Sequence, residues 1–139
     1  MIALRLLGHV WTLPNTLLGL VVGVCLTFGL PRRVPGRGFL RFASGRGISA
    51  RVVRAGPWAT TLGAVVIFWN PEVAEREDYL AHEGYHVNQY LALGPFFLPI
   101  YLAFLPFTGW REQHPLEWPA YRASDPGRRS RGDRSVKSE

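Results

Sequence analysis

Two histidines and a glutamate stand at a spacing that suits metal chemistry, in the segment His82-Glu83-Gly84-Tyr85-His86. This is an H-E-x-x-H motif. In an α-helix, residues four apart lie one turn apart on the same face, so both imidazoles can reach one zinc ion. Zinc lowers the pKa of a bound water and polarises a carbonyl group, and Glu83 is placed to accept the proton as a general base. The motif therefore predicts a zinc-dependent hydrolase of amide bonds.

Two histidines do not complete such a site, because catalytic zinc usually takes three protein ligands and one water. The segment 114–121 offers two further ligands. Glu117 is the first choice for the third ligand and His114 is the alternative, followed by Glu112 and His9. A donor that stabilises the transition state is also needed. The candidates for it are His114, Tyr121 and Tyr101.

Helices must carry these side chains. Asn70-Pro71 resembles a helix start, with Asn as N-cap and Pro at the first helical position, and Gly94-Pro95 predicts an end of the motif helix at Leu93. The apolar stretch 91–107 contains three prolines, so a broken helical hairpin or an interfacial segment is expected there. Pro119 would break a helix begun at Pro115, which favours a helix that starts near Glu117.

Strands are expected before the motif helix. Residues 38–43 and 49–54 are typical of short strands, with a turn at 45–47, and the apolar run 62–69 predicts a better buried third strand. The predicted fold class is therefore α+β. It combines an apolar N-terminal helix, a small antiparallel sheet of about three strands, a zincin-like active-site helix and broken apolar helices.

The N-terminal half combines a long apolar run with a strong positive charge. Residues 6–30 are uncharged, long enough for a helix that spans or deeply enters a membrane. A buried core helix and a cleaved signal peptide are the alternatives. Residues 1–71 contain eight arginines and no acidic residue, whereas the rest carries ten acidic and eight basic residues, which gives +6 in total. These arginines can attract anionic headgroups, and the positive-inside rule places the catalytic part on the cytoplasmic side.

Length and composition indicate one globular domain. The expected division is an apolar helix or membrane anchor at 1–30, a zincin-like metallopeptidase domain at 31–123 and a basic disordered tail at 124–139. Cys25 is the single cysteine, which excludes an internal disulfide framework. Nucleic acid is not an expected partner, because the arginines are not interleaved with aromatic residues in a recognised motif.

The stretch from Ala59 to Tyr121 resembles gluzincin-type zinc metallopeptidases, in particular small uncharacterised bacterial H-E-x-x-H domains. The resemblance implies that the apolar strand borders the substrate cleft, that Glu117 joins His82 and His86 at zinc, and that Glu83 serves catalysis on a peptide or protein substrate. The alternative interpretation is a non-catalytic, metal-stabilised module associated with a membrane. The residues that carry the resemblance are Thr61-Leu62-Gly63-Ala64-Val65-Val66-Ile67-Phe68, the motif with Leu80-Ala81 before it and Val87-Asn88-Gln89 after it, Gly94-Pro95, Pro115-Leu116-Glu117 and Ala120-Tyr121.

Overall fold

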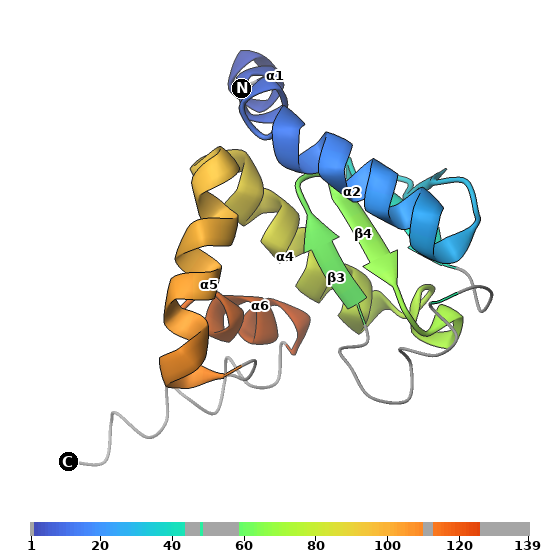
Figure 1. Ribbon diagram of the computed structural model, residues 1–139. Coiled ribbons are helices and arrows are strands. Elements are labelled where there is room, and N and C mark those ends of the chain that lie inside the picture. Colours follow the sequence, from blue (N-terminus) through green and yellow to red (C-terminus); the bar gives the residue numbers. More distant parts are fainter. Residues whose placement is uncertain (1, 44–47, 49–58, 110–112, 126–139) are drawn as a thin grey trace.

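The computed structural model describes residues 2–43, 48, 59–109 and 113–125, which form an α+β arrangement (Figure 1). Its sheet has the order β1-β2-β4-β3. The strands are β1 (Arg32–Arg33), β2 (Leu40–Ala43), β3 (Ala59–Leu62) and β4 (Val65–Phe68). The α-helices are α1 (Ile2–Trp11), α2 (Leu13–Thr27), α4 (Glu77–Leu93), α5 (Phe97–Thr108) and α6 (Glu117–Ser124), with short 3-10 helices η1 (Pro71–Val73) and η2 (Gly94–Phe96).

Strand β4 is the buried centre of the fold, and all four of its side chains are inaccessible to solvent. Successive side chains of a strand point to opposite faces of the sheet. Val65 and Ile67 accordingly pack in a cluster with residues of α2, whereas Val66 and Phe68 pack in a second cluster with Leu80 of α4. The sheet therefore lies between the N-terminal helices and the helix that carries the motif.

The predicted sheet was wrong in type and in strand bounds. It is mixed, because β4 pairs in parallel with β2 and antiparallel with β3. The run 62–69 is also not one strand: Gly63 and Ala64 form a two-residue turn between β3 and β4. Gly63 has a φ of +62°, a conformation that glycine adopts without strain and that suits a hairpin turn. The expected strand at 49–54 and turn at 45–47 lie outside the described residues.

The apolar N-terminal run forms two helices that meet at Thr12, and α2 lies along the sheet (Figure 1). Its buried residues are small or polar and recur every four positions: Asn15, Gly19, Gly23 and Thr27. A Cβ atom at Gly23 would lie 2.3 Å from the ring of Phe42, so only glycine permits this approach. Leu20, Val22 and Leu26 pack against the sheet beside them, whereas Leu17, Leu18, Val21 and Val24 are exposed.

The motif helix ends where predicted but begins later. Asn70 does act as a cap, since its side chain accepts a hydrogen bond from the Glu72 N–H, but it caps η1. An extended backbone at Arg76 separates η1 from α4, which begins at Glu77. The predicted end at Leu93 is confirmed, and Gly94 follows with a φ of +58°.

Beyond Gly94 the chain turns through η2 into α5, which leaves α4 at a sharp angle (Figure 1). Within the described ranges, the stretch Glu77–Thr108 that contains both helices is long and apolar enough to cross a membrane by length and composition.

Helix α6 begins at Glu117, as the position of Pro119 predicted. Pro119 then lies in the first turn of α6, where a backbone N–H has no acceptor within the helix. The absence of an N–H in proline therefore costs no helical hydrogen bond there. Because α6 reaches Ser124, the predicted tail boundary at 124 was one residue early, and 126–139 lie outside the described residues.

Candidate metal centre

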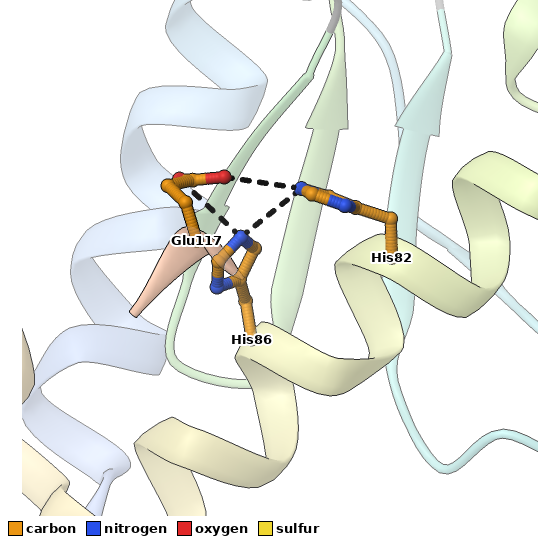
Figure 2. Close-up of side chains that lie close together, drawn as sticks. All are labelled: His82, His86 and Glu117. Carbon is orange, nitrogen blue, oxygen red and sulfur yellow. Dashed lines mark hydrogen bonds and ion pairs between the residues drawn. The ribbon is translucent and has the colours of Figure 1, made fainter. Parts of the chain in front are cut away.

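His82 and His86 on α4 and Glu117 on α6 point toward one another (Figure 2). The two imidazole Nε2 atoms are 3.2 Å apart. Glu117 Oε2 lies 3.3 Å from His82 Nε2, and Glu117 Oε1 lies 3.5 Å from His86 Nε2. Three side chains from two helices therefore present two nitrogen atoms and a carboxylate in a compact triangle.

The dimensions of this triangle suit zinc. Tetrahedral zinc binds nitrogen and oxygen at about 2.0–2.2 Å, which places neighbouring ligand atoms roughly 3.3–3.5 Å apart. The three measured distances, 3.2, 3.3 and 3.5 Å, are close to this separation, and each histidine nitrogen faces a different oxygen of the Glu117 carboxylate. Two imidazoles and a carboxylate are also a donor set of catalytic zinc sites, which leave the fourth position for water or substrate. The residues present therefore fit the ion that the motif predicts.

The charges at the triangle are mutually stabilising. Burial raises the pKa of Glu117, but hydrogen bonds from His82 and His86 and the positive charge of His86 outweigh it and hold that pKa far below its usual range. For His86, burial lowers the pKa, whereas Glu117 and the charge of Glu83 raise it above its usual value. The buried carboxylate of Glu117 thus stabilises positive charge at His86, and a bound cation can take the place of the proton on His86 Nε2.

Gln89 is a functional residue that the motif alone did not identify. The carbonyl oxygen of Leu116 can only accept, so the Gln89 amide nitrogen donates to it, at 3.0 Å. The amide oxygen then faces His86 Nδ1 at 2.8 Å, and Nδ1 must be the protonated ring nitrogen. This tautomer leaves the lone pair of His86 on Nε2, toward the triangle. The spacing of three residues between His86 and Gln89 on one helix was the sequence signal for this contact.

The carboxylate of Glu83 is buried beside this triangle, in the wall of the same cavity. The hydroxyl of Thr61, on strand β3, donates a hydrogen bond of 2.6 Å to Glu83 Oε2. Thr61 therefore fixes the orientation of the carboxylate that was predicted to act as the base. No sequence pattern signalled this pairing, because the two residues come from different elements.

The two tyrosines named from the sequence both line the cavity, but they have different partners. The Tyr101 hydroxyl donates a hydrogen bond of 2.6 Å to Glu117 Oε1. The ring of Tyr121 packs edge-on against His82, with 4.7 Å between ring centroids. Tyr101 therefore supports the third ligand, and Tyr121 lies against the first.

His114 does not join the triangle, so its prediction as an alternative ligand or as a transition-state donor was wrong. Its ring is fully buried, and Nε2 donates to the backbone carbonyl of Tyr101 at 2.9 Å. Nδ1 accepts the N–H of Leu116 at 3.2 Å. Both nitrogens are thus used to fix the segment before α6. His9 lies on α1 and is not in the triangle, and Glu112 lies outside the described residues.

A cavity of about 850 Å³ opens beside the triangle. Strand β3 forms one wall and helices α4, α5 and α6 form the others. Because β3 is the last strand in the sheet order, its far edge has no strand partner among the described residues. The cavity therefore joins a candidate metal centre, a buried carboxylate and the edge of a sheet.

Comparisons with known proteins identified no relative of this chain. No family model matches the chain. No curated protein and no solved structure matches it either. The resemblance to gluzincins accordingly depends on the residues quoted for it.

Proposed function

We propose that this protein is a zinc-dependent hydrolase, and specifically a membrane-associated metallopeptidase in which Glu83 is the general base. The observation that carries the proposal is the triangle of His82, His86 and Glu117, whose nitrogen–nitrogen and nitrogen–oxygen distances of 3.2, 3.3 and 3.5 Å are close to the separation of neighbouring ligands around tetrahedral zinc. The buried carboxylate of Glu83 lies in the same cavity wall. Zinc held there would lower the pKa of water and polarise the scissile carbonyl group.

The side chains around the triangle then have separate tasks. Glu83 accepts the proton of the attacking water and passes it to the leaving amine. The hydrogen bond from Thr61 to Oε2 keeps the carboxylate in one orientation, with Oε1 as the proton acceptor. Gln89 and Tyr101 hold His86 and Glu117, and Tyr121 is the candidate donor to the developing oxyanion.

The position of β3 favours a peptide over other amides. The cavity is lined by all four residues of this strand, which is the last strand of the sheet in the described part of the chain. An edge strand offers unpaired N–H and C=O groups to an extended peptide, which can add to the sheet through main-chain hydrogen bonds. A peptide bound in this way would lie beside both Glu83 and the triangle.

Zinc analysis of the purified full chain tests the first part of the proposal. We expect about one zinc per chain, and we expect removal by a chelator to lower the thermal unfolding midpoint, because a metal that binds only the folded state stabilises it. Cobalt or zinc added back should restore the midpoint. A metal-free preparation whose unfolding curve does not respond to zinc would contradict the proposal. Zinc binding without turnover of any peptide library would favour the non-catalytic metal-stabilised module.

Membrane association is proposed from the exposed apolar side chains. Phe28 is 74% exposed and Leu30 is 84% exposed, and the exposed arginines Arg32 and Arg33 follow them directly. Apolar groups next to cations suit the boundary between acyl chains and anionic headgroups. The proposed location is the cytoplasmic side of the membrane, as the positive-inside rule indicated.

Vesicle binding tests this association. We expect the protein to sediment with vesicles that contain phosphatidylglycerol, and we expect Leu30→Asp to weaken binding about tenfold, since burying one leucine is worth roughly 1.5–3 kcal/mol. Arg33→Gln should weaken binding to anionic vesicles only. Binding that is insensitive to both substitutions, or equal binding to DNA, would argue against this partner.

A further inference from the structure

Helix α5 forms part of two surfaces at once. Four of its residues line the cavity: Phe97, Leu98, Tyr101 and Leu102. Its outward side chains are exposed and apolar, and Phe107 is 86% exposed. The helix contains no charged residue, and Phe97 is its one buried residue. One uncharged helix therefore separates the candidate metal centre from the surroundings of the protein.

We infer that the substrate is a membrane-borne polypeptide that places an apolar segment into this cavity, past helix α5. The inference rests on the proposed zinc hydrolase and specifies its substrate. Two independent features lead to it: the chemistry of the cavity wall and the continuity of α5 with the exposed apolar surface.

The cavity wall favours apolar side chains over acidic ones. Beside the metal centre it is formed mainly by Leu62, Leu98 and Leu102 together with aromatic rings. The charged side chains in the wall outside the two histidines are acidic: Asp78, Glu83 and Glu117. No Lys or Arg lines the cavity within the described part of the chain, so away from the metal centre an acidic substrate side chain would find no cationic partner in the wall. An apolar side chain would gain from burial against the leucines.

The exposed face of α5 continues onto the N-terminal helices. The ring of Phe96, next to the start of α5, lies 6.0 Å from the ring of Trp11 at the end of α1. From there the exposed leucines and valines of α2 lead to the arginines Arg32 and Arg33. A bilayer surface satisfies both parts of this face, because acyl chains cover the apolar residues and anionic headgroups pair with the arginines. A second copy of the chain would cover the apolar residues but would place like charges together.

Two hydroxamic acids that share one metal-chelating group and differ in the length of the alkyl chain test the cavity. The test does not require a known cleavage sequence. Acetohydroxamic and octanohydroxamic acid are titrated against the zinc-loaded full chain. We expect octanohydroxamic acid to bind at least tenfold more tightly, the gain from burying about two methylene groups. Leu98→Asn should remove most of this preference and leave the zinc content and the affinity for acetohydroxamic acid unchanged.

Phe107→Asn is the matched control, because Phe107 lies on the outward side of the same helix and does not line the cavity. We expect Phe107→Asn to retain the preference for octanohydroxamic acid. We expect the same variant to cleave an apolar palmitoylated peptide in phosphatidylglycerol vesicles at least threefold more slowly than the wild type. Equal affinities for the two hydroxamates, or unchanged cleavage in vesicles, would overturn the inference alone. Failure of both hydroxamates to bind the zinc-loaded protein would overturn the proposed function itself.

Discussion

Replacing Glu83 by glutamine is expected to leave zinc in place and to lower peptide turnover by about 10²–10⁴-fold, the usual contribution of general acid–base catalysis. Glutamine has the shape of glutamate, and its amide can still meet the hydroxyl of Thr61. It cannot accept the proton of the attacking water. Because Glu83 is not part of the triangle, the three atoms that would hold zinc are unaffected. Turnover with a fluorogenic peptide and zinc analysis of the same sample measure the two effects separately.

Thr61→Val provides the graded control for Glu83. It removes the hydrogen bond to Oε2 and keeps the volume and the strand preference of the side chain. We expect turnover between that of the wild type and that of Glu83→Gln, again with one zinc per chain. Turnover in Glu83→Gln that equals the wild type would exclude Glu83 as the base, even if zinc is present.

The second large effect is expected at Glu117. Glu117→Ala removes the one carboxylate of the triangle and leaves the two histidine nitrogens, 3.2 Å apart, as the remaining ligands. Loss of a direct ligand should reduce zinc affinity by more than the roughly 10–100-fold that follows from changing an outer contact. Competition with a fluorescent zinc chelator measures this affinity.

Two variants separate direct from indirect contributions to zinc binding. Gln89→Leu breaks the contact that fixes the tautomer of His86, so we expect a loss of about 10–100-fold. His114→Ala should retain zinc affinity but lower the unfolding midpoint, because both of its buried ring nitrogens bond to the backbone. Zinc lost in His114→Ala from a folded protein, and kept in Glu117→Ala, would reverse the assignment of the third ligand.

The sequence was sufficient where a single element decides the outcome. Spacing of four residues placed His82 and His86 on one face of a helix, and Gly94-Pro95 ended that helix at Leu93. Pro119 moved the start of α6 to Glu117 in the same way. Each of these features depends on backbone geometry within a few residues, which residue type controls directly.

Other features were decided by contacts between distant segments. Local pattern made Glu117 the first choice and left His114 as an alternative. The placement of Glu117 beside the two histidines followed from the packing of α6 against α4, with His114 held by the backbone near Tyr101. The run 62–69 was apolar throughout, so its division by the turn at Gly63 depended on the approach of Thr16, whose hydroxyl accepts the N–H of Ala64.

The N-terminal apolar run shows most clearly what sequence pattern cannot determine. Its composition determined that the run is apolar and that most of it, up to Thr27, is helical. Hydropathy does not specify which side of a helix meets protein. Only packing on the sheet showed that Gly19 and Gly23 face inward while Leu17 and Val21 are exposed. Spacing along the chain thus determined which side chains share a helix face, whereas long-range packing determined which elements meet, because those contacts join residues far apart in sequence.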